Sequence, residues 1–79
     1  MTLTYTWHAL VRMSERKISE KEVEEIVNHP AILKQGRDGA LHAAGVWEGK
    51  RGKFLNVIFI KQNHHVVVIT VYPSERVII

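Results

Sequence analysis

Residues 54–72 read FLNVIFIKQNHHVVVITVY, and this stretch decides the fold. It contains two runs rich in Val, Ile and Phe, Phe54–Lys61 and His65–Tyr72, which are joined by three polar residues. Such residues favour strands, and a short polar connection favours an antiparallel hairpin. Strict alternation of side chains in the second run predicts one face made of Val66, Val68, Thr70 and Tyr72. We therefore expect these two strands at the centre of an antiparallel sheet.

Shorter strands are expected upstream of this hairpin. Ala31–Gln35 and Leu41–Trp47 are separated by a turn at Gly36–Gly39, and residues 48–53 form a basic, glycine-containing connection to the first central strand. At the N-terminus, Thr2–Thr6 alternates polar and larger side chains, which predicts a short edge strand.

A helix is predicted to start at Ser19. Ser19 and Glu22 have the spacing of a capping box, in which each side chain satisfies a backbone N–H of the other residue. Ile18 and Val23 fit the hydrophobic staple around that box, and Pro30 ends the helix because the residue before a proline avoids helical angles.

An earlier helix is predicted over Trp7–Lys17, with Thr6 as its cap. Its periodicity predicts one broad apolar side made of Trp7, Ala9, Leu10, Val11 and Met13. The chain of 79 residues is too short for more than one domain. We therefore expect a single α+β domain over residues 1–79, with two N-terminal helices packed on one face of an antiparallel β-meander.

Composition excludes several classes of protein. The sequence has no cysteine, which excludes disulfide scaffolds, thiolate zinc sites, iron–sulfur clusters and cysteine nucleophiles. The first residues lack the basic and apolar regions of a signal peptide, and no apolar run approaches the ~20 residues of a membrane span. The sequence therefore predicts a cytoplasmic protein without a membrane segment.

Charge is unevenly distributed along the chain. The net charge is +3, but residues 19–30 carry four glutamates and one lysine, so the remainder has a balance of +6. A basic remainder fits a phosphate backbone, because Lys and Arg supply most non-specific affinity for nucleic acid. A solvated surface of mixed charge is the alternative.

The most specific pattern is His8-x-x-x-Arg12-x-x-x-Arg16, which stacks three basic groups one helical turn apart. Arginine offers a planar fork that matches phosphate oxygens, and histidine exchanges a proton near neutral pH. The pattern indicates an anionic ligand such as an RNA phosphate. The alternative is that the arginines pair with Glu15, Glu20 or the acidic helix while His8 lies on a solvated face.

Other candidates lie in the strands and their connections. Thr70 and Tyr72 end the last strand with hydroxyls that fit a phosphate or a 2′-OH, although both also fit ordinary strand packing. The three cations Lys50, Arg51 and Lys53 fit a nucleic-acid contact and an exposed hairpin tip equally well. This glycine-flanked segment lacks the spacing of a phosphate-binding loop. Trp47 fits base stacking or the core.

The neighbouring His64 and His65 point to opposite faces and have no carboxylate or thiolate nearby in sequence, so no metal site is expected.

A resemblance adds to this reading. The residues that carry it are Trp7–Leu10 with Arg12 and Arg16, Ile18-Ser19 with Val23, Asn28–Pro30 and Val68–Tyr72. In these the chain resembles a small bacterial and archaeal domain family of uncharacterised function, itself similar to the BrnT and RelE/ParE-like toxins. The resemblance implies a microbial-ribonuclease-like fold, RNA cleavage without metal or cofactor, and an antitoxin that covers the basic face.

Together these observations predict a metal-independent endoribonuclease, the toxin of a toxin–antitoxin pair. His8 is expected to transfer a proton, Arg12 and Arg16 to hold the phosphate, and Thr70 or Tyr72 to position it, while the spacing identifies no second proton-transfer group. The loop cations Lys50, Arg51 and Lys53 are expected to contact RNA. The alternative is a non-enzymatic module that binds a protein or nucleic acid through the same basic face.

An apolar chain end, Val77-Ile78-Ile79, predicts an interface with a second copy or with an antitoxin.

Overall fold

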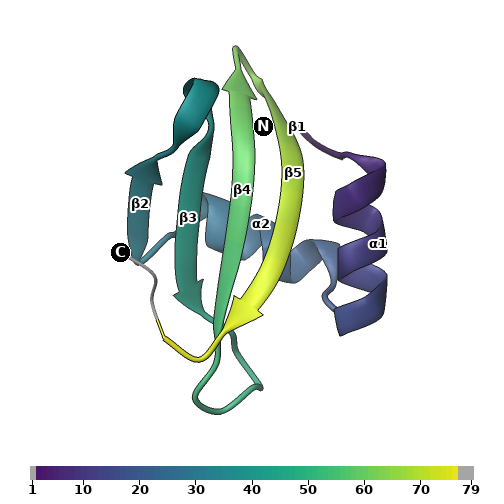
Figure 1. Cartoon of the computed structure of the whole chain (residues 1–79), viewed down its shortest axis with the longest axis vertical. Coiled ribbons are helices and arrows are strands. Elements are labelled where there is room, and N and C mark those ends of the chain that lie inside the picture. Colours follow the sequence, from purple (N-terminus) through teal and green to yellow (C-terminus); the bar gives the residue numbers. More distant parts are fainter. Residues whose placement is uncertain (1, 77–79) are drawn as a thin grey trace.

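A five-stranded sheet in the order β1-β5-β4-β3-β2 forms the centre of the molecule (Figure 1). The computed structural model describes residues 2–76. The strands are β1 (Thr2–Tyr5), β2 (Ile32–Gln35), β3 (Leu41–Val46), β4 (Phe54–Gln62) and β5 (His65–Ser74). The helices are α1 (Trp7–Arg16) and α2 (Glu20–Asn28), and a single 3-10 turn covers Arg37–Gly39. The predicted interface at residues 77–79 lies outside the described residues.

The α+β class and the central pair are confirmed, although the sheet is mixed. Strands β2 to β5 form the expected antiparallel meander, with β4 paired on both sides. Thr2–Tyr5 is an edge strand, as expected, but it runs parallel to β5, with Thr2 opposite His65 and Tyr5 opposite Val68. A parallel pair needs a long connection between its strands, and the whole chain from α1 to β4 provides it between β1 and β5 (Figure 1).

A β-bulge interrupts β5 and changes which side chains share a face. Ile58 pairs with Thr70 whereas its neighbour Phe59 pairs with Val68, so Ile69 is the extra residue. The strict alternation predicted for β5 is therefore wrong beyond Val68. The side chains of Val66, Val68 and Val71 are buried in the core, and Thr70 is turned to the opposite face.

Thr6 ties the bulge to the start of α1. Its backbone N–H donates to the Val68 carbonyl at 3.0 Å, and its hydroxyl donates to the Ile69 carbonyl at 2.8 Å. The same hydroxyl accepts from the Ala9 N–H at 3.1 Å, which makes Thr6 the predicted helix cap. One threonine thus satisfies backbone groups of both elements.

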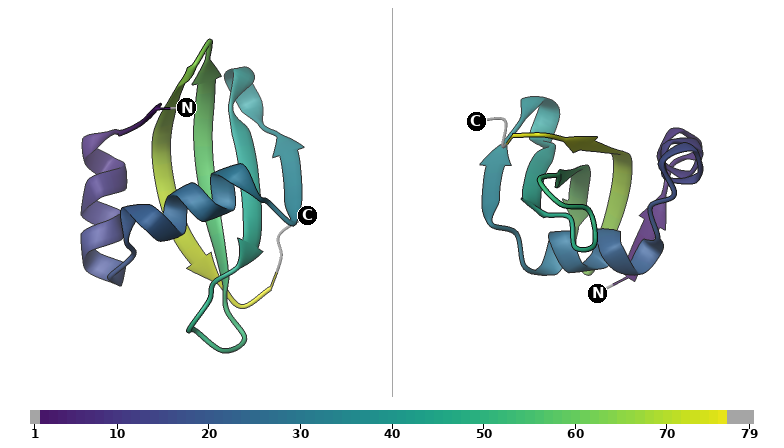
Figure 2. Two further views of the ribbon diagram at one scale, coloured as in Figure 1. Left: turned by 180° about the vertical axis from the view of Figure 1, so that it is seen from behind. Right: turned by 90° about the horizontal axis from the view of Figure 1, so that it is seen from below.

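Helix α2 begins and ends where the sequence predicts. The Ser19 hydroxyl accepts from the Glu22 N–H at 3.1 Å, and the Ser19 N–H donates to Glu22 Oε1 at 2.8 Å, which completes the capping box. The helix runs across one face of the sheet (Figure 2) and buries Val23 and Ile26 there. Gly45 of β3 permits this approach, because a Cβ at that position would lie 2.9 Å from Ile26 Cδ1.

Helix α1 stands at the β5 edge of the sheet rather than over its face (Figure 1). It consequently buries only a narrow stripe, centred on Ala9 and Met13. The prediction that α1 has one broad apolar side is wrong in part, because Trp7 is 79% exposed and Leu10 is 41% exposed instead of packing against the core.

The core lies between the helices and one face of the sheet. Its largest fully buried apolar side chains are Leu55, Val23, Val57, Val66, Val68 and Val71. Within residues 2–76, neither helix combines the length and apolar character needed to cross a membrane.

Candidate functional site

We call the surface of the sheet opposite α2 the open face. Side chains on this face come from alternate strand residues that do not join the core. Two rows of residues, each with one residue from each of the strands β2, β3, β4 and β5, cross this face. The first row is Lys34, His42, Ile58 and Thr70, and the second row is Ile32, Ala44, Asn56 and Tyr72. Residues far apart in the sequence are therefore brought together here by strand register.

Asn56 is the fully buried polar residue of this face, with 0% exposure. Its amide nitrogen donates to the Tyr72 carbonyl at 3.3 Å and to the Ser74 hydroxyl at 2.9 Å. These two contacts use the amide as a donor, which leaves its Oδ1 to accept from His42 Nε2 at 2.9 Å. A buried amide with all these partners is held in one orientation.

This arrangement fixes the proton position on His42. Because Nε2 donates to Asn56, the neutral imidazole carries its hydrogen there and its Nδ1 lone pair is free to accept a proton. The His42 ring is partly exposed, and its centroid lies 6.1 Å from that of the Tyr72 ring at an angle of 48°. A base therefore stands beside a phenol at the surface of the sheet.

Cationic and hydroxyl groups surround this pair. The exposed Lys34 is directly opposite His42 on the neighbouring strand β2, and Thr70 lies in the same row beyond Ile58. An ammonium group and a hydroxyl beside an imidazole can bind an anion next to a proton acceptor.

The structure brings only two of the five predicted catalytic residues, Thr70 and Tyr72, to this face. His8, Arg12 and Arg16 are exposed on α1, where Arg12 Nη1 lies 3.3 Å from Glu15 Oε1. Among residues 2–76, no hydrogen bond or ion pair joins these three side chains to Thr70 or Tyr72. The alternative interpretation of this pattern was that the arginines pair with nearby glutamates, and the Arg12–Glu15 contact is one such pair.

The predicted loop cations have different surroundings. Lys50 Nζ lies 5.6 Å from the centroid of the Trp47 ring, Lys53 Nζ lies 3.1 Å from Glu75 Oε1, and Arg51 is exposed. Two of the three cations are thus already in contact with other side chains of the domain.

Sequence reasoning missed His42 and Asn56. The available signal was the position of Asn56, a polar residue between Leu55 and Val57 in the most apolar strand. An amide in a buried strand requires hydrogen-bond partners, but only the register of the sheet identifies them as His42, Tyr72 and Ser74.

A protein-family model described as Domain of unknown function (DUF4258) matches residues 5–73. The chain belongs to the DUF4258 family. The expected membership of an uncharacterised domain family is confirmed, and the matched residues include α1, His42, Asn56 and Tyr72. No curated protein and no solved structure matches the chain.

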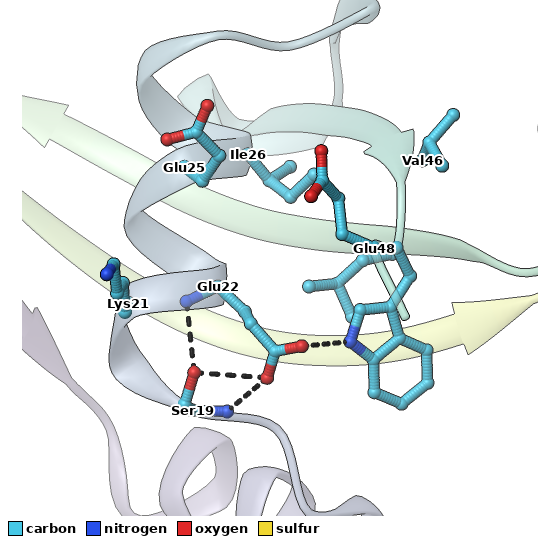
Figure 3. A pocket seen from close by; sticks show the side chains of 9 residues that line it. Ser19, Lys21, Glu22, Glu25, Ile26, Val46 and Glu48 are labelled. Atoms are coloured by element: carbon cyan, nitrogen blue, oxygen red, sulfur yellow. Dashed lines mark hydrogen bonds between the residues drawn. The ribbon is translucent and has the colours of Figure 1, made fainter. Parts of the chain in front are cut away.

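The DUF4258 domain also has a hollow on the opposite side, between α2 and the end of β3 (Figure 3). We call it the α2 groove. Its volume is about 290 Å³, and it is lined by Ser19, Lys21, Glu22, Glu25, Ile26, Val46, Trp47, Glu48 and Leu55. The Trp47 indole N–H donates to Glu22 Oε2 at 2.5 Å. Trp47 is nearly buried, so it is a core residue whose polar edge is satisfied.

The contacts of Glu22 change its acidity. Partial burial acts to raise the pKa of Glu22, but hydrogen bonds from the Ser19 backbone, the Trp47 indole and the Ser19 hydroxyl, together with the charge of Lys50, lower it below its ordinary value. The carboxylate is therefore favoured in the folded DUF4258 domain.

A pH-dependent stability follows from this lowered pKa. A group whose folded pKa is depressed contributes stability above its unfolded pKa and loses it as the pH falls through the folded value. We expect Glu22→Gln to lower the melting temperature at neutral pH, and the difference from wild type to shrink as the pH drops below 4.5, the ordinary pKa of the group. Thermal melts across this range check it, with the exposed Glu24→Gln as control; a difference that does not vary with pH would contradict it.

Proposed function

We propose that this domain is a metal-independent endoribonuclease whose reacting groups lie on the open face around His42. The observation that carries the proposal is the hydrogen bond from His42 Nε2 to the fully buried Asn56, which leaves Nδ1 as a proton acceptor. RNA supplies its own nucleophile, the 2′-OH, so a correctly placed base is the first requirement of the reaction.

The reaction proceeds by transfer of the 2′-OH proton to His42 Nδ1. The 2′-oxygen attacks the adjacent phosphorus and the bond to the 5′-oxygen breaks, which gives a 2′,3′-cyclic phosphate and a 5′-hydroxyl. Tyr72, whose ring lies beside that of His42, protonates the leaving oxygen. Lys34 and Thr70 hold the non-bridging phosphate oxygens, where charge develops. His42 then loses its extra proton to water, and the Tyr72 phenolate takes a proton from water, which restores both groups.

The basic residues outside this face bind the RNA backbone. His8, Arg12 and Arg16 lie along the exposed side of α1, which favours contacts with phosphates away from the reacting one. Lys50, Arg51 and Lys53 extend such contacts at the β3–β4 loop. We propose further that the domain acts as a toxin and that an antitoxin covers this basic surface.

Product chemistry tests the proposal. The purified domain is incubated in EDTA with an RNA oligonucleotide and with the DNA oligonucleotide of the same sequence. We expect cleavage of the RNA alone, with fragments that carry 2′,3′-cyclic phosphate and 5′-hydroxyl ends by mass spectrometry. Cleavage of both strands contradicts a 2′-OH nucleophile, and binding of RNA without cleavage favours the non-enzymatic module.

A further inference from the structure

Helix α1 has a second apolar surface, on a side that does not pack on the sheet. All the residues that line a shallow hollow there belong to α1 itself: Trp7, Leu10, Val11, Ser14 and Glu15. Trp7 is 79% exposed and Leu10 is 41% exposed, whereas the stripe that packs on the core is centred on Ala9 and Met13. Within residues 2–76, no other element lines this hollow, and α1 stands at the edge of the molecule (Figure 1).

The spacing along this surface is that of a helix-packing seam. Four residues stand at i, i+3, i+4 and i+7, and we call them the outer seam: Trp7, Leu10, Val11 and Ser14. Residues at these intervals follow one line along a helix. The side chains of a second helix can lie between those of the first along such a line. The partner indicated by this spacing is therefore another helix.

The outer seam is complementary to itself when two copies run antiparallel. Its largest side chain, Trp7, stands at one end and its smallest, Ser14, at the other. A two-fold axis between Leu10 and Val11 places these two residues of one copy beside Val11 and Leu10 of the other. The same axis places each Trp7 beside the Ser14 of the other copy. Each exposed indole then enters the hollow where the other copy has only a serine side chain.

We propose that the domain forms a two-fold dimer in which α1 packs antiparallel against α1 of a second copy. A second copy is the occupant that the described residues favour, because one seam supplies both the projecting side chain and the space that receives it. Exposed aromatic side chains that fill a partner's pocket are typical anchors of interfaces, which gives Trp7 that role. The seam covers only about two helical turns, so the interface belongs to the small class below about 1,200 Å² and is expected to be weak.

The charges of α1 permit this pairing. Glu15 is the ionisable residue among those that line the hollow. Residue 15 faces residue 6 of the other copy, so the two Glu15 residues lie about 13 Å apart along the helix axis. Salt screens most of the repulsion at that separation. Each Glu15 also lies on the same flank as His8 of the other copy, while Arg12 and Arg16 lie on the opposite side of the helix and stay exposed.

The dimer is independent of the proposed function. Helix α1 stands at the β5 edge of the sheet, whereas His42 lies on β3 (Figure 2). The oligomeric state is measured without RNA, so the outcome of a cleavage assay neither supports nor contradicts the dimer.

Cysteine cross-linking tests the register, because the chain has no cysteine of its own. Val11→Cys places two thiols next to the two-fold axis, where a disulfide can form. Ser14→Cys places them about 10 Å apart along the helix axis, too far for a disulfide, although Ser14 is the more exposed position. Under mild oxidation, we expect a covalent dimer on a non-reducing gel for Val11→Cys and a monomer for Ser14→Cys.

Sedimentation equilibrium tests the fit of Trp7 beside Ser14. The wild-type chain is expected to approach twice its mass of 9.1 kDa as its concentration rises. Trp7→Ala, which removes the anchor, and Ser14→Trp, which fills its space, are each expected to weaken the dimer at least tenfold in Kd. Their equimolar mixture is expected to recover the dimer, because each contact again joins one indole and one small side chain. Leu33→Ala, which removes an exposed side chain on β2, is expected to change nothing.

Several results overturn the inference once circular dichroism and melting temperature show that each variant is folded. One is a wild-type chain that remains monomeric up to about 1 mM, where even weak specific contacts form. Others are Ser14→Cys cross-linking as readily as Val11→Cys, Trp7→Ala and Ser14→Trp staying dimeric, and their mixture staying monomeric. A wild-type monomer whose outer seam instead binds a helix of a different protein would replace the second copy as the occupant.

Discussion

His42→Ala is expected to reduce the rate of RNA cleavage by about 10²–10⁴-fold, the usual contribution of a positioned general base. The expectation rests on the His42 Nε2–Asn56 hydrogen bond of 2.9 Å, which directs the Nδ1 lone pair away from the amide. His42 lies outside the apolar core, but its removal leaves the buried Asn56 Oδ1 without its partner and is expected to cost about 1–3 kcal/mol of stability. Initial rates with a single RNA oligonucleotide, measured for the folded variant, check the prediction.

The matched control is His64→Ala. His64 is exposed in the turn between β4 and β5, outside the hydrogen-bonded cluster on the open face. Its removal is expected to leave the cleavage rate within about twofold of wild type. If His42→Ala cleaves as fast as His64→Ala, His42 is not the base.

Asn56 is a positioning residue rather than a catalytic one in this scheme. It touches the imidazole but faces no solvent, so it acts through the proton position of His42. Its loss is expected to change the rate constant of the bound complex more than the affinity for RNA, because the base is misoriented while the surface cations remain.

Phe59→Ala is expected to lower the free energy of unfolding by about 3–5 kcal/mol, the usual range for removing a buried phenylalanine. Phe59 is almost fully buried on β4, opposite Leu41 on one neighbouring strand and Val68 on the other. It also flanks the β-bulge of the β4–β5 pair. At about 0.05–0.15 kcal/mol per residue, a domain of 79 residues has roughly 4–12 kcal/mol of stability in total, so the loss is a large part of it.

Urea denaturation measures this loss as a shift of the midpoint. Leu33→Ala is the control, because Leu33 is 53% exposed and its truncation is expected to change stability by less than about 0.5 kcal/mol. A Phe59→Ala variant that is already unfolded without urea represents the upper end of the expected effect. A loss below about 1 kcal/mol would show that the core closes around the missing ring.

The sequence by itself determined the elements whose causes are local. The Ser19–Glu22 capping box lies within four residues, and Pro30 acts on the residue beside it, so both ends of α2 could be predicted. The β4–β5 hairpin was predictable for the same reason, since its strands are apolar runs joined by a short turn. The family membership also depends on the sequence alone.

Only the tertiary structure decided which side chains share a face of the sheet or of α1, and which residues form the candidate site. The bulge at Ile69 reverses the side chains after Val68, and it is held by Thr6, which is more than sixty residues away in sequence. Trp7 is exposed because α1 packs at an edge instead of over the sheet, which periodicity cannot distinguish. His42 and Asn56 meet because strand register places them on one face, and register depends on the packing of the whole sheet rather than on either residue.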